Sequence, residues 1–323
     1  MAVEILEPGL ATTVQDRGRP GHYDVGIPPS GALDLYSALA ANLLVGNPDD
    51  AAVLEAAYLG PRLRFTAPAV VAVTGATMPP TLNDAQVPQW ESVEVAEGDV
   101  LAFGYLQAGA RAYIAVSGGF DVPLVLGSRS TYGLGGFGGF EGRPLRAGDV
   151  LPVAKAGDGA RPGRAVPEEL RPALAREVDL RVVLGLYDYR LTDAGLATLL
   201  DTTWSLTPVA DRIGFRYTGG QLEWRDRVQP FGAGSDLSNI VDAGYPLGSI
   251  QVPGGVEPIL LHRDAVSGGG YAMVATVISA DLDAVGQSAP GTRTRFRPVS
   301  LDEALAARAE AAQRRSRLRE LLS

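Results

Sequence analysis

Short runs of β-favouring residues recur along the whole chain, and most of them end in Gly, Pro or Asp. They occupy residues 62–65, 70–74, 100–103, 112–116, 179–184, 271–278 and 292–297. Such runs predict strands, because Gly, Pro and Asp favour the turns that separate strands. The chain has 40 glycines and 23 prolines in 323 residues, enough for a turn-rich fold. We therefore expect a mainly β architecture.

Three of the expected strands are introduced by one kind of turn. The segments AEGDVLAF from Ala96, RAGDVLPV from Arg146 and APGTRTRF from Ala289 each place a glycine before an alternating run. Glycine is favoured in tight turns before strands. The repetition fits an internal duplication and fits equally well a turn that proteins use often.

Helical signals are few. Residues 33–45 carry leucines at helical spacing before a Gly-Asn-Pro stop, and residues 192–200 follow a cap at Thr192 or Asp193. In the tail, Ser300 and Glu303 form a capping box. One packed stripe is expected to follow it, formed by Leu301, Ala304, Leu305, Ala312 and Leu318. We expect the charged remainder of the tail to face solvent.

The segment AGDGARPGRAVPEELRP, between Lys155 and Pro172, is rich in Gly, Pro and charge and has the composition of a linker. It predicts an N-terminal β-barrel domain over residues 1–160. A C-terminal β-barrel domain, which includes the terminal helix, is expected over residues 175–323.

Composition excludes several classes of function. The net charge of −9 argues against nucleic acid and anionic membranes as partners, since both require a basic surface. The chain has no cysteine and two histidines, which excludes thiolate chemistry and multi-His metal sites. We expect no metal site in the chain. No run approaches the ~20 apolar residues of a membrane span, and the N-terminus does not resemble a secretion signal, so we expect a cytoplasmic protein.

Two motifs favour structural interpretations. The segment GLGGFG, residues 133–138, has the GxGxxG spacing but is followed by no helical pattern, so we expect a loop over a site or interface rather than a dinucleotide site. His262 lies near Ser267 and beside Asp264, yet sequence proximity does not establish a triad. We expect His262 to be an ordinary residue at the end of a strand, and His22 to make surface polar contacts.

Two polar clusters are candidate binding sites. Gln15, Asp16, Arg17 and Arg19 crowd between turn residues, where they could recognise a small amide or carboxylate, or fix a loop through an Asp–Arg pair. Residues 128–131, Ser-Arg-Ser-Thr, place one cation among three hydroxyl groups, a set that suits an oxyanion and equally a capped turn. In the second half, Arg212 and Gln251 lie beside tight turns, as at a barrel rim.

The same segments resemble one protein family. The supporting stretches are TTVQDRGRPG from Thr12, PPSGALD from Pro28, ANLLVGN from Ala41, VTGA from Val73, RAYIAVSGG from Arg111, LGSRST from Leu126, DRIGFRY from Asp211, GSIQVPGGVEPILL from Gly248 and GGYAMVATVISADL from Gly269. In this order they are similar to the KipA family, which includes the C subunit of 5-oxoprolinase and allophanate hydrolase subunit 2 and is also called the biotin-dependent carboxyltransferase family.

This resemblance implies two cyclophilin-like β-barrels, a KipI-like partner that corresponds to the B subunit of 5-oxoprolinase and, in 5-oxoprolinase systems, a third partner like the A subunit. The implied function is that of one subunit in an ATP-dependent amidohydrolase that opens a small amide or lactam, such as 5-oxoproline or an allophanate-type compound. ATP and magnesium would serve the complex, and the sequence shows no cofactor site of its own. The alternatives are a carboxyltransferase module that requires a biotinyl carrier elsewhere, or a regulatory binding subunit.

Combining the clusters with the resemblance, we predict two sets of site residues. The predicted catalytic residues are Asp16, Arg19 and Arg129. The predicted substrate-binding residues are Gln15, Ser30, Asp34, Ser130, Thr131, Arg212, Gln251, Asp264 and Tyr271. The chain departs from the family's DxQTTGGYP-like motif, because Val266 and Gly268 stand where Gln and Thr are usual. If those groups contact the substrate, the chain has lost two hydrogen-bond partners, each worth roughly 1–3 kcal/mol when buried. Such a loss would favour an altered substrate or a non-catalytic role.

Overall fold

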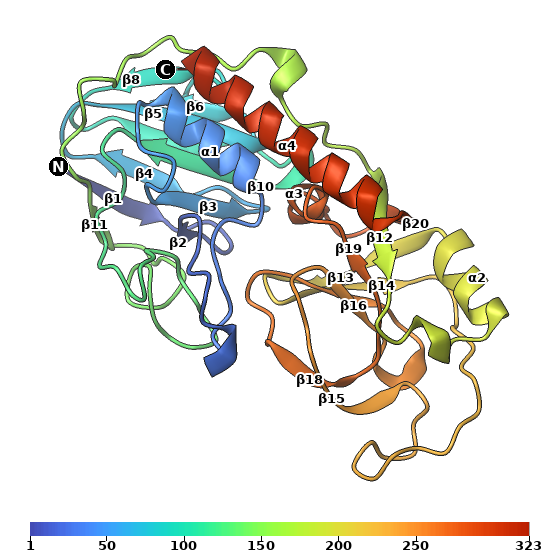
Figure 1. Cartoon of the computed structure of the whole chain (residues 1–323). Coiled ribbons are helices and arrows are strands. Elements are labelled where there is room, and N and C mark those ends of the chain that lie inside the picture. The colour runs from blue at the N-terminus through green and yellow to red at the C-terminus, as the bar shows by residue number, and fades with distance from the viewer. Residues whose placement is uncertain (323) are drawn as a thin grey trace. The chain divides into compact units, whose positions relative to one another are not determined.

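The structure, a computed structural model, describes residues 1–322 and divides into two compact units (Figure 1). Unit 1 contains residues 1–19 and 30–174 together with the chain from Gln313 onward. Unit 2 contains residues 20–29 and 175–312. The expected domains, 1–160 and 175–323, differ from these units because residues 20–29 cluster with the second half and the end of the C-terminal helix clusters with the first.

Unit 1 is built from eleven strands and one internal helix. They are β1 (Ala2–Glu7), β2 (Thr13–Gln15), α1 (Leu35–Leu44), β3 (Val53–Ala57), β4 (Arg62–Phe65), β5 (Ala69–Thr77), β6 (Pro80–Leu82), β7 (Ala85–Gln86), β8 (Ser92–Val95), β9 (Val100–Phe103), β10 (Ala108–Val116) and β11 (Val150–Pro152), with the 3-10 turn η2 (Glu168–Leu170). The strands form a six-stranded sheet, β11-β1-β4-β9-β6-β7, and a five-stranded sheet, β2-β3-β10-β5-β8.

The five-stranded sheet of unit 1 is buried on both faces. On β5, Val71 and Val73 pack into the core shared with the six-stranded sheet, while Val70 and Ala72 pack into a second core under α1. Successive side chains of a strand point to opposite faces, so a strand covered on both sides becomes a continuous apolar run. Unit 1 therefore has three layers, sheet, sheet and helix, with α1 and the end of the C-terminal helix on the outer face (Figure 1).

Unit 2 contains a closed barrel. Its elements are η1 (Tyr23–Val25), β12 (Glu177–Leu184), η3 (Asp188–Arg190), α2 (Asp193–Asp201), β13 (Trp204–Ala210), β14 (Gly214–Thr218), β15 (Asn239–Gly244), β16 (Ser249–Gln251), η4 (Pro253–Gly255), β17 (Ile259–Leu261), β18 (Gly268–Tyr271), β19 (Met273–Val277), α3 (Leu282–Gly286) and β20 (Arg293–Pro298). Seven strands close in the order β12-β19-β16-β17-β14-β13-β20, and β15 pairs with β18 in a separate two-stranded sheet. The mainly β prediction is confirmed. The closed barrel lies in unit 2, whereas the strands of unit 1 form two sheets.

The predicted helix starts are confirmed. Thr192 caps α2 by accepting a hydrogen bond from the Gly195 amide at 3.0 Å. In the last helix, α4 (Leu301–Leu322), the Ser300 amide donates to Glu303 Oε2 at 2.7 Å and the Glu303 amide donates to Ser300 Oγ at 3.2 Å, which closes the capping box. These bonds form locally, so their residue types predict them well.

The predicted stripe on α4 is wrong for most of its length. Leu301 is 64% exposed and Leu305 is 41% exposed, whereas the residues that pack are Ala307, Leu318 and Leu322. Leu318 and Leu322 are one turn apart and join the core under α1. A helix buries only the side chains that another part of the protein covers. The periodicity of the helix does not show which side chains those are.

The three predicted glycine turns are confirmed. Gly98, Gly148 and Gly291 have φ of +89°, +88° and +85°, and no atom lies within 4 Å of a Cβ built at any of them. Each precedes its strand, β9, β11 or β20. Left-handed backbone, rather than crowding, therefore requires glycine at these positions. The strands that follow these turns belong to different kinds of sheet: β9 and β11 lie in the six-stranded sheet of unit 1, and β20 lies in the closed barrel of unit 2.

The turn before β11 also carries a part-buried ion pair with a pH consequence. Arg143 donates to both carboxylate oxygens of Asp149, at 2.8 and 2.9 Å, and the Arg146 amide donates to Asp149 Oδ2 at 2.7 Å. The hydrogen bonds from Arg143, the main cause, hold the pKa of Asp149 below its usual value. A carboxyl with a lowered folded-state pKa stabilises the fold above its unfolded pKa, about 3.9, and loses that contribution as pH falls through the folded value.

We expect Asp149→Asn to lower the free energy of unfolding at pH 7 by about 1–3 kcal/mol. The difference from the wild type should narrow as the pH falls below about 4. Urea unfolding at pH 7 and pH 3 measures both values. Asp158→Asn is the matched control, because Asp158 is exposed and its side chain forms no hydrogen bond or ion pair within residues 1–322. An equal loss of stability at both pH values would contradict this assignment.

Candidate functional site

The two N-terminal clusters predicted from sequence meet in unit 1, around the carboxylate of Asp16. Asp16 Oδ1 accepts hydrogen bonds from the Gly18 amide at 2.7 Å and Ser128 Oγ at 2.6 Å, and also from Ser130 Oγ. Asp16 Oδ2 accepts one from the Arg129 amide. Four donors therefore converge on a carboxylate that is 8% exposed. These contacts make Asp16 the residue that holds the 128–130 loop, and its catalytic assignment stays a prediction.

Strand β2 joins the other side of the same loop. The Thr131 amide donates to the Val14 carbonyl at 2.9 Å, and Gln15 Nε2 donates to the Thr131 carbonyl at 3.3 Å. Gln15 Nε2 also donates to Thr13 Oγ1 at 3.0 Å. Gln15, Ser130 and Thr131 are all buried. The polar side chains of this predicted binding cluster thus bind one another across more than 110 residues of sequence.

Arg19 is buried under the glycine-rich loop 133–138. Its Nη2 donates to the Ser130 carbonyl, and its guanidinium lies 5.1 Å from the centre of the Phe137 ring. Gly138 has φ of +70°, and a Cβ there would collide with the Ser130 carbonyl and with Arg19. The expected loop is confirmed, since turns and no helix follow the glycines. Its role is to cover Arg19, which is 1% exposed.

Arg129 and Ser30 differ in their surroundings. Arg129 reaches the surface and pairs with Asp121 at 3.1 Å, with 30% of its side chain exposed. Ser30 is fully buried with φ of +51°, and its Oγ has no hydrogen-bond partner within residues 1–322. A buried hydroxyl without a partner is uncommon in folded proteins. Arg129 stays a predicted catalytic residue, and Ser30 stays a predicted substrate-binding residue.

Asp34 belongs to a buried polar network beneath α1. Its carboxylate caps the helix by accepting from the Ser37 amide at 2.9 Å, and its own amide donates to the Tyr113 hydroxyl at 2.8 Å. That hydroxyl donates to Glu55 Oε2 at 2.9 Å. Burial, and then the charge of Glu55, raises the pKa of Tyr113 well above its usual value, which keeps the phenol a donor. The network fixes the start of α1.

The second-half candidates lie in unit 2. Arg212 Nε donates to Asp264 Oδ2 at 2.7 Å, and its Nη2 donates to Asp264 Oδ1 at 3.3 Å. Gln251, at the end of β16, has a buried Oε1 that accepts no hydrogen bond from the described residues. The Tyr271 amide donates to the hydroxyl of Tyr245 at 2.7 Å, while the Tyr271 ring is 40% exposed. The structure joins Arg212 to Asp264 directly.

The two positions of the motif departure, Val266 and Gly268, differ in their surroundings. Val266 is 48% exposed, so a hydrogen-bonding side chain at this position would face solvent rather than a buried partner. Gly268 pairs with Gly244 in the β15–β18 sheet. Val266 is therefore not buried within this chain, and contact of either position with a substrate stays a prediction.

His262 is a structural residue, as expected. It is fully buried directly after β17, and its Nδ1 accepts a hydrogen bond from the Arg263 amide at 2.9 Å. Its Nε2 lies 3.2 Å from the Leu282 carbonyl and therefore donates to it. Both ring nitrogens have partners, so the ring holds the barrel to the start of α3.

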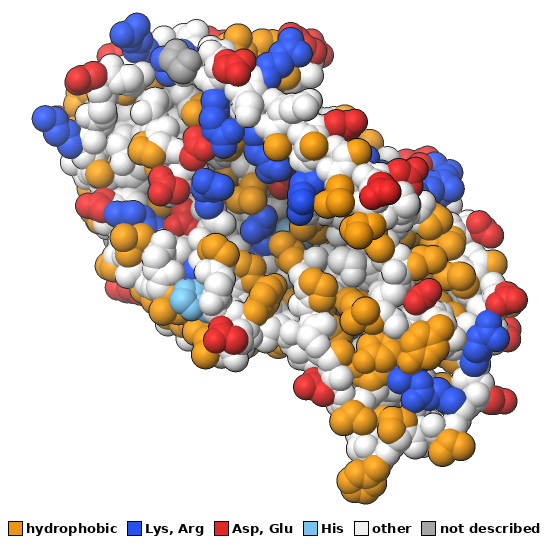
Figure 2. Space-filling view, viewed as in Figure 1, with side chains coloured by type: hydrophobic (Ala, Val, Ile, Leu, Met, Phe, Trp, Pro, Cys, Tyr) orange, Lys and Arg blue, Asp and Glu red, His pale blue; other side chains and the backbone are white. Residues whose placement is uncertain are grey.

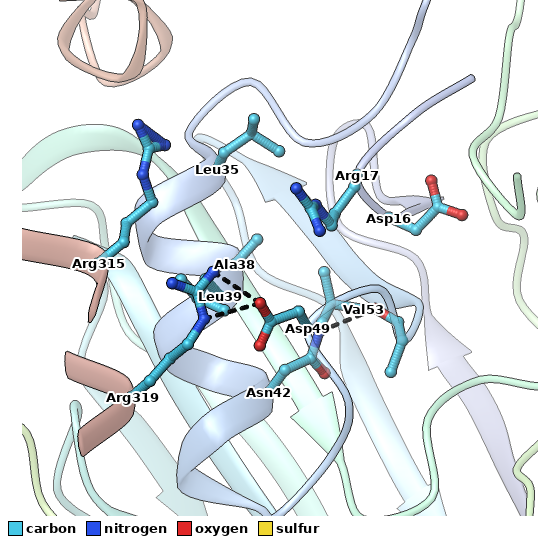
Figure 3. Close-up of a pocket in the computed structure, with 11 residues that line it drawn as sticks. Asp16, Arg17, Leu35, Ala38, Leu39, Asn42, Asp49, Val53, Arg315 and Arg319 are labelled. Carbon is cyan, nitrogen blue, oxygen red and sulfur yellow. Dashed lines mark hydrogen bonds and ion pairs between the residues drawn. The ribbon is translucent and has the colours of Figure 1, made fainter. Parts of the chain in front are cut away.

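A pocket lies beside the Asp16 cluster, entirely within unit 1 (Figure 3). Its cavity volume is about 50 Å³, and it opens to solvent. Its floor consists of aliphatic side chains from α1 and β3. Its charged lining consists of Asp16, Arg17, Asp49, Arg315 and Arg319. Figure 2 shows Lys and Arg side chains gathered over α1 and the C-terminal half of α4. The hollow is small, and its lining combines charged and aliphatic side chains, as small-molecule sites do.

The tail contributes to this pocket, which no pattern in the sequence predicted. The charged face of α4 is not simply solvated, because Arg319 donates to Asp49 Oδ2 from two nitrogens, at 2.9 and 2.7 Å. Arg314 lies 4.3 Å from the Tyr36 ring centre and donates to the Leu170 carbonyl at 2.8 Å. The unusual density of arginine in the tail was the available signal, but nothing in it indicated a partner about 270 residues away.

Residues 1–322 contain neither a cluster of metal ligands nor a helix able to span a membrane. Their His, Asp and Glu side chains form no group of three or more suited to a metal ion. Over the same range, no helix combines the length and apolar character that crossing a bilayer demands.

The comparisons with known proteins agree on one family. The profile of the carboxyltransferase domain, subdomain A and B, matches residues 25–298. The chain is 34% identical over 307 residues to the 5-oxoprolinase C subunit of Escherichia coli, a match that covers 95% of this chain and 94% of that protein. This chain belongs to the carboxyltransferase domain family. The resemblance expected from the motifs is confirmed.

Other members of the carboxyltransferase domain family are much longer proteins. Urea amidolyase of Lachancea kluyveri is 36% identical over 312 residues, which cover 93% of this chain and 17% of that protein. The crystal structure of Kluyveromyces lactis urea carboxylase superposes with a TM-score of 0.92 and 36% identity, covering 98% of this chain and 29% of that one. The chain therefore spans less than a third of these relatives.

Proposed function

We propose that this chain is the substrate-binding component of a multi-subunit enzyme that opens a small amide or lactam, with 5-oxoproline as the first candidate substrate. The observation that carries the proposal is the arginine-lined pocket of unit 1, bordered by the rigid Asp16 cluster. The match to the C subunit of 5-oxoprolinase supports it, because it extends over nearly all of that protein. A lactam is an unactivated amide, so coupling its opening to ATP is chemically reasonable.

In this proposal ATP and magnesium serve the complex and are held by a KipI-like partner or by a third partner like the A subunit of 5-oxoprolinase. The support for placing ATP on the partners is that the sequence has no Walker A motif. We therefore assign this chain no step that involves ATP. Its residues bind and orient the amide, and the loop 128–131 keeps one wall of the site rigid through Asp16.

The test is 5-oxoproline-dependent ATP hydrolysis by this chain, alone and mixed with the products of neighbouring genes. We expect no turnover by the chain alone, and equal amounts of phosphate and glutamate from the mixture. A mixture without 5-oxoproline is the control for uncoupled hydrolysis. A mixture that cleaves neither 5-oxoproline nor allophanate in the presence of ATP and magnesium would refute the amidohydrolase proposal.

A second candidate function is carboxyl transfer from a biotinyl carrier. It is favoured by the family match and by the close superposition on urea carboxylase. The only lysine, Lys155, lies in VAKAG and does not resemble a biotinylation site, so this function needs a carrier on another chain or domain. Transfer of labelled carboxylate from carboxybiotin to urea by the same mixture tests it, and failure of that transfer removes the candidate.

A further inference from the structure

The charges around the unit 1 pocket are unevenly paired. Three arginines and two aspartates line it. The Asp16 carboxylate is occupied by the four donors of the 128–130 cluster, and Asp49 is occupied by Arg319. Within residues 1–322, the side chains of Arg17 and Arg315 form no hydrogen bond or ion pair. Two guanidinium groups are therefore left for a ligand.

These two arginines reach the pocket from different parts of unit 1. Arg17 follows β2 and Arg315 belongs to α4, and in Figure 3 their side chains lie on either side of Leu35. The Arg319–Asp49 pair anchors α4 on the other side of the hollow. Between these charges the floor is aliphatic, formed by residues that include Leu39 and Val53. The lining is thus cationic at one end and apolar below.

We propose that Arg17 and Arg315 bind the carboxylate of a small acylamino acid whose aliphatic part rests on Leu35 and Leu39. Guanidinium groups suit this role because they stay charged and donate pairs of hydrogen bonds that match the two oxygens of a carboxylate. The inference rests on the proposed function, because it takes this pocket as the substrate site. It adds the specificity element, namely that a free carboxylate on the substrate is required.

Calorimetric binding to the full chain tests the proposal without any turnover. The probes are 5-oxoproline and N-acetylglycine, which carry a carboxylate, and 2-pyrrolidinone, the same lactam ring without one. We expect 5-oxoproline to bind at least about 10-fold more tightly than 2-pyrrolidinone, as a charge-assisted hydrogen bond allows. Arg17→Ala and Arg315→Ala should each weaken 5-oxoproline binding by roughly 10-fold and leave 2-pyrrolidinone unaffected.

Two further variants separate local from general effects. Arg17→Lys keeps the charge and should restore part of the affinity. Arg317→Ala removes a charge from α4, the helix that carries Arg315. Because Arg317 is exposed and lies outside this pocket, the variant should bind 5-oxoproline as tightly as the wild type does. Circular dichroism confirms that each variant is folded.

Three results would overturn the inference. The first is an unchanged affinity for 5-oxoproline in Arg17→Ala and Arg315→Ala. The second is that the wild type binds neither 5-oxoproline nor N-acetylglycine at millimolar concentration. The third is that inorganic phosphate binds more tightly than 5-oxoproline and that this binding is lost in the same variants. The last would assign the site to a phosphoryl group. If 5-oxoproline binding depends on Arg17 and Arg315 but the mixture hydrolyses no ATP with its substrate, only the proposed function is refuted. If the mixture opens 5-oxoproline but binding does not depend on these two arginines, only this inference is refuted.

Discussion

Replacing Asp16 with Ala is expected to lower the free energy of unfolding of unit 1 by about 3–5 kcal/mol. The reason is that one buried carboxylate satisfies four donors at once, two backbone amides and two serine hydroxyls. A buried donor left without a partner costs about 1–3 kcal/mol, and the two serine hydroxyls recover part of this by rotating. The loss should therefore exceed that of an ordinary surface substitution several-fold.

Urea unfolding measures this loss, and hydrogen–deuterium exchange over residues 125–139 locates it. The exchange of that loop should accelerate more than the exchange of the barrel strands in unit 2. Asp121→Ala is the matched control, because it removes a nearby carboxylate that is exposed. The side chain of Asp121 is 53% exposed. An exposed pair contributes about 0–1 kcal/mol. If Asp16→Ala cost no more than this control, the carboxylate would not be the centre of the loop.

Replacing Glu55 with Ala should have an effect of similar size. Glu55 Oε2 accepts hydrogen bonds from the Leu33 amide at 2.8 Å and the Tyr113 hydroxyl at 2.9 Å. Glu55 Oε1 lies 3.8 Å from Arg111 Nε, and both side chains are 3% exposed. Removing one partner of a buried ion pair leaves the other charge uncompensated, which costs about 3–5 kcal/mol.

A double-mutant cycle with Arg111→Ala tests the origin of that loss. If the two charges depend on each other, the double variant should be more stable than the sum of the single losses predicts, by about 0.5–3 kcal/mol. Glu4→Ala is the control, since Glu4 pairs with Arg64 at 3.1 Å on the surface. Additive losses from Glu55 and Arg111 would show that the two residues act independently.

Much of the local structure was predictable because its causes are local. The glycine before β9, the cap of α2 and the capping box of α4 depend on atoms within four residues of one another. The apolar run of β5 was readable as a strand, but the sequence did not show which of its faces packs into which core. The predicted run 271–278 shows the limit, since it contains β19 but not the preceding β18, a glycine-rich strand that lies in a different sheet.

The site was predictable only as a list of residue types. The segments around Asp16 and Ser130 were both identified, because polar side chains between turns are chemically distinctive. Their contact was not predictable, since nothing near Asp16 in sequence refers to a serine 114 residues away. The same applies to Arg315 and Arg319, whose place in the pocket depends on where the end of α4 packs.

The sequence by itself determined the class of fold, the starts of the main helices, the glycine turns and the family. These depend on backbone preferences and hydrogen bonds that each segment carries with it. Only the tertiary structure decided that Asp16 serves as the centre of a loop, that His262 binds at both ring nitrogens, and that Arg17 and Arg315 share a pocket. Packing decides such pairings, because whether a charge meets a partner, a ligand or water depends on which distant surface covers it.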